Sequence, residues 1–235
     1  MSKSPFENRI ALVTGASRGL GYAIARELGT QGAHILALAR TVGGLEALDE
    51  EIKAAGGAAT LVPLDVTDDP GLERLGAAIH ERWGHLDLWV HTATAAVPLA
   101  PAEHIDNKDL AKILSINIRS TQRLIRVLDP LLRQAEAGQA IYFSDPSADG
   151  RPFHGGYRAG KAATAELFET WATELAPVSK VSVRCAAAPP MKTALRLRFH
   201  PGEDPAQLAE TSVIARRLVA KLSDVDAEAF DLRAD

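Results

Sequence analysis

Cysteine is almost absent: Cys185 is the single one among 235 residues, so no disulfide can form within the chain. Cys185 lies in the apolar run 181–188, which indicates a packed strand residue rather than a nucleophile. Long apolar runs are also absent, because none approaches the roughly 18 residues that a membrane-spanning helix needs. The short polar segment 1–8 has no apolar region typical of a signal peptide. We therefore expect a cytoplasmic protein with no membrane partner.

The chain also lacks a basic stripe. Its formal net charge is -4 and its Lys and Arg residues are dispersed, so nucleic acid is not an expected partner. Neither an internal repeat nor a low-complexity tract or linker divides the sequence, and its 46% hydrophobic content can form one substantial core. These features predict a single domain over residues 1–235, and no metal site is expected.

Short apolar runs alternate with longer segments of helix-like spacing. The expected strands are 10–13, 33–39, 59–64, 86–91, 140–144 and 181–187. Long helices are expected over 106–135, 156–176 and 206–222, and a short edge strand over 229–232. This alternation is typical of a doubly wound α/β fold, in which a parallel sheet is flanked by helices on both faces.

A glycine-rich segment, Thr14 to Gly21, directly follows the first expected strand and precedes a helical pattern over 22–30. Glycines at such a turn permit left-handed or crowded backbone and let a pyrophosphate approach the amides at the helix N-terminus. A tight turn without a ligand is the alternative, but the strand, the glycine spacing and the helix together favour a dinucleotide site. The residues assigned to this site are Gly15, Ser17, Arg18, Gly19, Leu20 and Gly21.

Two arginines indicate which dinucleotide binds. Arg18 lies inside the glycine turn, and Arg40 directly follows the second strand, where the adenosine ribose is expected. An NAD-selective site usually has a carboxylate at that strand end, whereas this strand ends without an acid. We therefore favour NADP(H) over NAD(H); two solvated surface arginines are the alternative. Asp65 and Val66 follow the third strand, where Asp65 either accepts the adenine amino group or starts a turn.

Tyr157 and Lys161 are the candidates for chemistry. They are four residues apart, so they share one face of a helix and can reach the same ligand. A phenol has a reference pKa of about 10, and a nearby ammonium favours its ionised form, so Lys161 would ease proton transfer to or from a substrate oxygen. Lys161 can also hold the nicotinamide ribose. A partly exposed helix face is the ordinary interpretation of such a pair, but the glycine turn favours catalysis.

Together these motifs resemble the short-chain dehydrogenase/reductase family, in the family's order and spacing and over nearly the whole chain. The resemblance rests on the Thr14 to Gly21 turn, Asp65-Val66, Asn117 in a long helix, and Tyr157 with Lys161. It implies a Rossmann-type fold and hydride exchange between a nicotinamide ring and a carbonyl or alcohol carbon. It also implies a tyrosine as general acid/base, a supporting serine, a lysine, and an asparagine that holds a proton-relay water. Without the resemblance, Asn117 would be an ordinary polar helix residue.

The serine position departs from the family pattern. Ser144 lies at the family's usual distance before the tyrosine. The family usually has a Ser-Ser pair at this strand end, whereas Ser144 is followed by Asp145. A carboxylate there would repel a developing alkoxide and raise the pKa of Tyr157, opposing Lys161. We assign Ser144 as the catalytic serine, and Ser147 is the alternative, which requires a rebuilt loop.

The loop after the fourth strand departs as well. It reads His91-Thr92-Ala93-Thr94 where the family usually has an Asn-Asn-Ala-Gly type of sequence. Thr94 therefore replaces a glycine beside the cofactor, where it can crowd the site or shift the loop. Thr92 and Ala93 are still assigned to the cofactor, although Thr92 lacks the two-ended hydrogen bonding of asparagine. We interpret His91 as structural.

The loop after the sixth strand begins Pro189-Pro190 in place of a Pro-Gly turn that usually borders the nicotinamide. Pro190 removes an amide and fixes the backbone angle. Pro189 and Thr193 are assigned to the cofactor, with Thr193 near the carboxamide or a phosphate. The resemblance implies that the following segment, around 190–212, forms a mobile lid over the substrate.

Two kinds of substrate fit the sequence. Arg196, Arg198 and His200 could attract an acidic substrate, or they are solvated charges on a loop. Phe153 and Tyr142 would instead suit an apolar substrate. The sequence does not choose between the two.

The expected helices 106–135 and 156–176 carry more apolar positions than one sheet face requires. Leu167, Phe168 and Trp171 fall on one broad apolar face, and the family commonly pairs these helices across a twofold axis. We therefore expect a homodimer or homotetramer; core packing within the chain is the alternative.

Two functional classes follow from the sequence. The first is an NADP(H)-dependent carbonyl reductase or alcohol dehydrogenase, in which Tyr157 passes the proton and Ser144 steadies the carbonyl oxygen. The second is a degenerate family member that binds nucleotide in a regulatory or structural role with little turnover. The second class is motivated by the departures at Thr92, Thr94, Asp145 and Pro190. Against it, a pure binding protein has no chemical need for Tyr157, Lys161 and Asn117.

Overall fold

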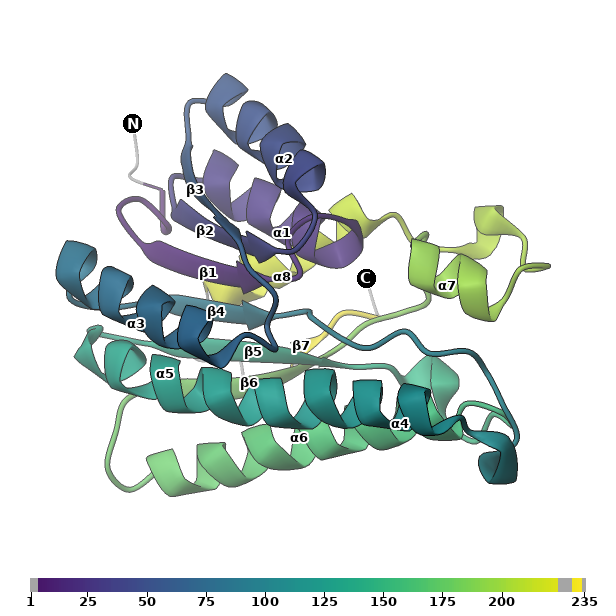
Figure 1. The fold of residues 1–235 in the computed structure, drawn as a ribbon. Helices are drawn as coiled ribbons and strands as arrows, with labels where there is room; N and C mark the ends of the chain where they lie inside the picture. The colour runs from purple at the N-terminus through teal and green to yellow at the C-terminus, as the bar shows by residue number, and fades with distance from the viewer. Residues whose placement is uncertain (1–3, 224–229, 234–235) are drawn as a thin grey trace.

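The computed structural model describes residues 4–223 and 230–233 (Figure 1). Within these residues, seven strands form one parallel sheet between two layers of helices. The strands are β1 Ile10–Thr14, β2 His34–Ala39, β3 Ala58–Pro63, β4 Leu88–His91, β5 Gln139–Ser144, β6 Ser182–Ala187 and β7 Phe230–Asp231. Their order across the sheet is β3-β2-β1-β4-β5-β6-β7. The predicted doubly wound, Rossmann-type fold is confirmed.

The strands form at the apolar runs because helices cover both faces of the sheet. β4 is buried throughout, and every residue of β2 after His34 is buried. Strands covered on both faces need apolar side chains at consecutive positions rather than at alternate ones. The first six predicted strands begin and end within two residues of the observed ones, although β3 at one edge of the sheet is only partly buried. The predicted edge strand is present as β7, which pairs with β6, although residue 229 lies outside the described residues.

Two helical layers cover the sheet, with α1, α2 and α8 on one face and α3, α5 and α6 on the other (Figure 1). The helices are α1 Gly19–Thr30, α2 Val42–Ala54, α3 Asp69–Trp83, α4 Asn107–Ile113, α5 Ser120–Gln134, α6 Gly155–Leu175, α7 Ala194–Phe199 and α8 Thr211–Leu222. Among the described residues, none of these helices is both long and apolar enough to cross a membrane.

The long helix predicted over 106–135 is interrupted. Its first part is α4, its last part is α5, and the π-helical turn Leu114–Arg119 joins them. Such turns add a residue to the helical repeat and are frequent at functional sites. Asn117, one of the predicted site residues, is buried inside this turn.

The apolar face proposed for subunit contact packs largely inside the chain. Phe168 is fully buried on α6, with its ring centroid 5.0 Å from that of Trp89. Trp171 is buried beside it and donates its indole N–H to Asp129 at 2.9 Å. Core packing, the alternative interpretation, therefore applies to Phe168 and Trp171, whereas Leu167 is half-buried.

The predicted last helix begins later than expected. Residues 206–210 are not part of α8, because Pro205–Gln207 forms a separate 3₁₀ turn capped by Asp204. The expected lid contains the short helix α7, whose first turn is capped by the Thr193 hydroxyl. A β-bridge between Met191 and Ala209 brings the two ends of this segment together.

Candidate active site

The carboxyl ends of the strands border one cavity of about 590 Å³. In doubly wound sheets, ligands bind at this edge, where the strand order reverses. Every residue that the sequence predicts for the cofactor lines this cavity: Gly15, Ser17, Arg18, Gly19, Leu20, Gly21, Arg40, Asp65, Val66, Thr92, Ala93, Tyr157, Lys161, Pro189 and Thr193. Of the predicted catalytic residues, Ser144, Tyr157 and Lys161 line it and Asn117 does not.

Two features require glycine in the turn after β1: its positive φ angles and the close approach of Thr92. Gly15 and Gly19 have φ angles of +83° and +60°, which favour glycine. A Cβ at Gly21 would lie 2.4 Å from Oγ1 of Thr92 and 2.5 Å from the carbonyl oxygen of Gly15. The Thr92 hydroxyl donates to the Thr14 carbonyl at 2.7 Å, so it is fixed against these glycines. Thr92 thus packs the turn from the neighbouring strand.

The N-terminus of α1 can hold an anion. Gly19, Leu20 and Gly21 in its first turn line the cavity. The first four N–H groups of a helix lack intrahelical acceptors, and the helix dipole favours negative charge there. Arg18 at the N-cap makes no side-chain capping bond. This backbone therefore fits a pyrophosphate group.

Arg40 extends from the end of β2 beside the same cavity. Its Nη1 lies 3.4 Å from Oδ2 of Asp65, and 61% of its side chain is exposed. Asp65 also accepts from the backbone N–H and the hydroxyl of Thr67, at 2.9 and 2.8 Å. Burial raises the pKa of Asp65, but Thr67 and Arg40 outweigh burial and hold that pKa below its usual value. Asp65 therefore starts a turn and contacts Arg40, and its contact with the adenine stays a prediction.

Tyr157 lies in the first turn of α6 and is almost fully buried. Its hydroxyl donates to Oδ2 of Asp145 at 3.0 Å. Burial raises the pKa of Tyr157, the Asp145 carboxylate raises it further, and Arg196 lowers it to a smaller extent. The pKa of Tyr157 therefore lies above its usual value. The raised pKa agrees with the influence of Asp145 expected from the sequence, and the charge that opposes Asp145 is that of Arg196.

Lys161 follows Tyr157 by one helical turn and lines the same cavity. Burial lowers the pKa of its ammonium group, and the Asp145 carboxylate and Cys185 offset part of this effect. Asp145 therefore interacts with both members of the predicted Tyr157–Lys161 pair. It favours the neutral phenol and the charged ammonium.

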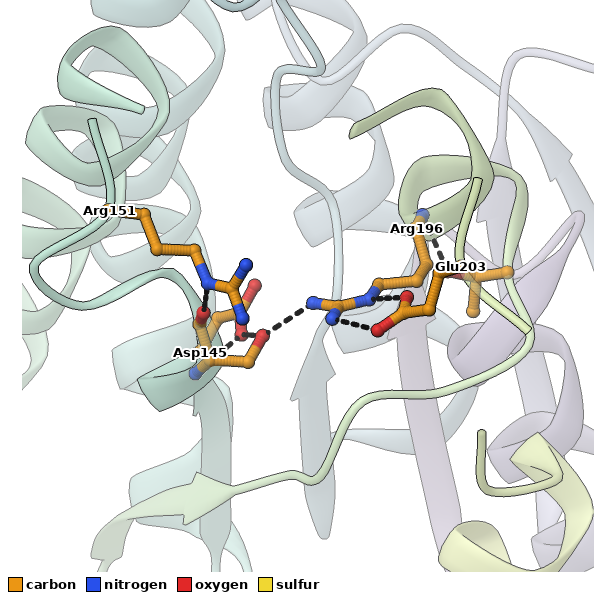
Figure 2. A network of polar contacts seen from close by, with 6 residues as sticks. Asp145, Arg151, Arg196 and Glu203 are labelled. Carbon is orange, nitrogen blue, oxygen red and sulfur yellow. Dashed lines mark hydrogen bonds and ion pairs between the residues drawn. The ribbon is translucent and has the colours of Figure 1, made fainter. Parts of the chain in front are cut away.

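A chain of hydrogen bonds joins Asp145 to the lid segment (Figure 2). The Ser147 hydroxyl donates to Oδ1 of Asp145 at 2.6 Å and accepts from Nη1 of Arg196 at 2.9 Å. Arg196 in turn donates through Nε and Nη2 to the two carboxylate oxygens of Glu203, at 2.5 and 2.6 Å. Because the Ser147 hydroxyl is engaged on both sides, Ser144 is the better candidate for a serine that meets substrate.

Asn117 is fixed away from the cavity. Its side chain accepts from the backbone N–H of Ala95 at 2.9 Å and donates to the Thr94 hydroxyl at 3.0 Å. Its backbone carbonyl accepts from the hydroxyls of Thr121 and Thr164, at 2.7 and 2.9 Å. Asn117 therefore holds the loop after β4, and Thr94, which was expected to crowd the site, is one of its partners.

His91 is a buried residue at the end of β4, as interpreted from the sequence. Its Nδ1 lies 2.9 Å from the Thr14 hydroxyl, and its Nε2 lies 3.3 Å from the Thr121 hydroxyl. Burial and the nearby Lys161 lower the pKa of His91 to about 3. A neutral imidazole with both nitrogens partnered is a structural group.

The aromatic residues expected near the substrate lie elsewhere. Tyr142 is buried in the core, where its ring stacks on Phe168. Phe153 has a φ angle of +68° and is 56% exposed, and it is not among the residues that line the cavity. Both assignments to the substrate site are therefore wrong.

Two phenylalanines that line the cavity, Phe143 and Phe199, were not assigned from the sequence. Phe199 of α7 packs edge-on against Tyr157, with ring centroids 5.0 Å apart, and also against His154. Leu195 packs against the same small cluster. The signal was the four-residue spacing of Leu195 and Phe199, which marks one face of a helix within the lid.

These features agree with a comparison against known families. A family model described as short chain dehydrogenase matches residues 9–204. The chain belongs to the short-chain dehydrogenase/reductase family. A fatty acyl-CoA reductase from Acinetobacter baylyi is 29% identical over 187 residues, which cover 79% of this chain and 59% of that protein. The chain thus spans about three fifths of the length of this relative.

Solved structures of the family share the whole fold. A protein from Pseudomonas syringae described as a short-chain dehydrogenase is 27% identical and superposes with a TM-score of 0.91, covering 99% of this chain and 97% of that chain. A second, from Shigella flexneri 2a, is 26% identical with a TM-score of 0.89, covering 99% of this chain and 100% of that chain, and is complexed with NADP. The family consists of oxidoreductases, and structural relatives of this chain bind NADP.

Proposed function

We propose that this chain is an NADP(H)-dependent oxidoreductase that interconverts a carbonyl compound and the corresponding alcohol. The observation that carries the proposal is that one cavity is lined by both sets of predicted residues. Arg18 and Arg40 follow β1 and β2, Ser144 is the last residue of β5, and Tyr157 and Lys161 lie on α6.

The chain's residues fit NADP(H) along the cavity. The amides at the start of α1 would bind the pyrophosphate, and Arg18 and Arg40 would pair with the 2′-phosphate. Val66 would border the adenine, and the Lys161 ammonium would bind the nicotinamide ribose. The remaining assigned contacts are Asp65, Thr92, Ala93, Pro189 and Thr193. The cofactor supplies a hydride donor or acceptor at its nicotinamide ring.

Tyr157 is proposed to move the proton. In reduction, the substrate carbon gains a hydride while the carbonyl oxygen takes the proton from the Tyr157 hydroxyl, so that the C=O double bond becomes a C–OH group. Ser144 would donate a hydrogen bond to the same oxygen, and the Lys161 charge would stabilise the phenolate until solvent returns the proton. Asn117 is proposed to act by fixing the loop after β4 through Thr94.

The lining favours an apolar carbonyl substrate over an acidic one. Phe199, Leu195 and Ala148 form an apolar cluster around Tyr157. Arg196, one of the three basic residues considered for an acidic substrate, is paired with Glu203. The segment around 190–212 is proposed as the lid that carries Phe199 and Leu195.

The test is NADPH and NADH binding by calorimetry, followed by loss of nicotinamide absorbance with a panel of aldehydes, ketones and quinones. We expect NADPH to bind more tightly than NADH, and turnover to be lost in Tyr157→Phe. Tyr22→Phe is the matched control, because the Tyr22 hydroxyl pairs with Glu51 rather than with a residue of the site. Failure to bind either nucleotide would refute the proposal.

A nucleotide-binding role without turnover is the second candidate. The observation that favours it is the hydrogen bond from Tyr157 to Asp145, which occupies the hydroxyl that a substrate needs. This candidate predicts tight NADPH binding with no reduction of any compound in the panel. It also predicts that Tyr157→Phe changes nothing other than the affinity for NADPH. A homodimer or homotetramer is proposed in either case, and sedimentation velocity of the purified protein measures it.

A further inference from the structure

One residue of the lid segment is held unusually firmly. The Arg196 side chain is only 10% exposed, although α7 is a short helix outside the sheet layers. Its three donating nitrogens all have partners: two donate to Glu203 and the third donates to Ser147. An arginine is seldom buried without a reason, because removing a charge from water is costly unless it is fully paired.

The partners of Arg196 lead to Tyr157 through Ser147 and Asp145. The hydrogen-bond directions are consistent along the path, because the Ser147 hydroxyl accepts from Arg196 and donates to Asp145. Asp145 then accepts from the Tyr157 hydroxyl. Arg151 supports the path from the other side, since its Nε donates to the Ser147 carbonyl at 2.6 Å.

The charges along this path affect how readily the Tyr157 phenolate forms. A carboxylate 3.0 Å from the phenol opposes formation of the phenolate, and Arg196 brings positive charge toward that carboxylate. Glu203 holds the guanidinium on its far side, so the positive end of the ion pair faces Ser147 and Asp145. Lys161 on α6 interacts with the same Asp145 carboxylate, which raises the pKa of its ammonium group against the effect of burial.

We propose that Arg196 is a positioning residue for the reaction: through Ser147 it offsets the charge of Asp145 beside Tyr157 and ties the closed lid to the acid–base group. This inference rests on the proposed function. The acid–base group is then complete only when α7 is docked, so proton transfer is coupled to closure over the substrate. Phe199 of the same helix packs against Tyr157 in the docked state.

The activity test is a double-mutant cycle between Arg196→Gln and Asp145→Asn. We expect Arg196→Gln to lower kcat at least 10-fold in the wild-type background, with a smaller change in KM, because the uncompensated carboxylate opposes the phenolate. In the Asp145→Asn background, Arg196→Gln should lower kcat less than threefold. Arg196→Lys, which keeps the charge, should recover part of the activity. Equal losses in both backgrounds would overturn the proposal.

Arg158→Gln is the matched control for the loss of one arginine. Arg158 neighbours Tyr157 in sequence, but its ion pair is with Asp149 and it does not line the cavity. A merely structural loss would lower the rate by the same factor at every pH. We expect Arg196→Gln instead to shift the pH profile of alcohol oxidation to higher pH, because the phenolate is less stable without the offsetting charge.

Hydrogen exchange tests the link between the lid and Ser147, and this measurement does not require turnover. Ser147→Ala breaks the path while it keeps every charge, so amides of 194–203 should exchange faster in this variant with NADPH present. If exchange is faster in Ser147→Ala but the wild-type protein reduces no substrate, the contact between the lid and Ser147 is supported. The proposed function is then refuted, and the contact is not. Unchanged exchange in Ser147→Ala would overturn the tie, whatever the activity.

Discussion

Replacing Asp145 by asparagine should speed the reaction. Asparagine keeps nearly the same shape and can still accept from Tyr157, but it removes the negative charge 3.0 Å from the phenol oxygen. Two unit charges at that distance repel by about 5.5 kcal/mol at an effective dielectric constant of about 20. Arg196 already offsets part of this repulsion.

Only part of this repulsion acts in the transition state, because the phenolate charge is only partly developed there. If about a quarter to a half is felt, the barrier falls by about 1.4 to 2.7 kcal/mol, which is about 10- to 100-fold in kcat/KM. Both directions share one transition state, so reduction and oxidation should accelerate together at neutral pH. The control is Asp149→Asn, since Asp149 is a solvent-exposed carboxylate paired with Arg158.

The assay is the pH dependence of alcohol oxidation, followed by NADPH absorbance, with the alcohol that corresponds to the best carbonyl of the panel. Oxidation needs the Tyr157 phenolate, and the pKa of Tyr157 is raised by burial and by Asp145. In the wild type, kcat/KM should therefore keep rising with pH. In Asp145→Asn the rise should level off at a lower pH. An unchanged profile, or a slower enzyme at all pH values, would refute the reasoning.

Three other changes test the cofactor site and the core. Gly21→Ala should abolish NADPH binding, because its Cβ would lie 2.5 Å from a backbone oxygen; Gly43→Ala, with nothing within 4 Å, is the calorimetric control. Arg40→Ala should weaken NADPH binding by about 1.5 to 3 kcal/mol, the usual value of a charge-assisted contact, and leave NADH binding nearly unchanged by calorimetry. Phe168→Ala should lower the free energy of unfolding by about 3 to 5 kcal/mol in urea, because this ring is fully buried.

The strands could be predicted because their signal is local. A run such as 33–39 is apolar at consecutive positions, and this is what a strand covered on both faces requires. The glycine turn after β1 was equally readable, since the positive φ angles at Gly15 and Gly19 demand that residue type. Because these segments follow the carboxyl ends of parallel strands, the fold then brings the assigned cofactor residues to one cavity.

The breaks in the helices could not be predicted in the same way. The π-helical turn around Asn117 is accompanied by hydrogen bonds to Thr94 and Ala95, which lie on a different segment. A periodic pattern carries no information about such partners, so one continuous helix was expected over 106–135. The partnership of Arg196 with Ser147 spans 49 residues and was equally invisible.

The departures from the family pattern bear on whether the site works. A buried polar group left without a partner costs about 1 to 3 kcal/mol, so a decayed site should accumulate unpaired groups. Two of the substituted side chains are paired: Thr94 bonds to Asn117, and Asp145 is joined through Ser147 to Arg196. Both of these side chains are thus matched by a neighbour that satisfies them. This matching favours an enzyme whose acid–base group is held by a different network over a protein that has lost its chemistry.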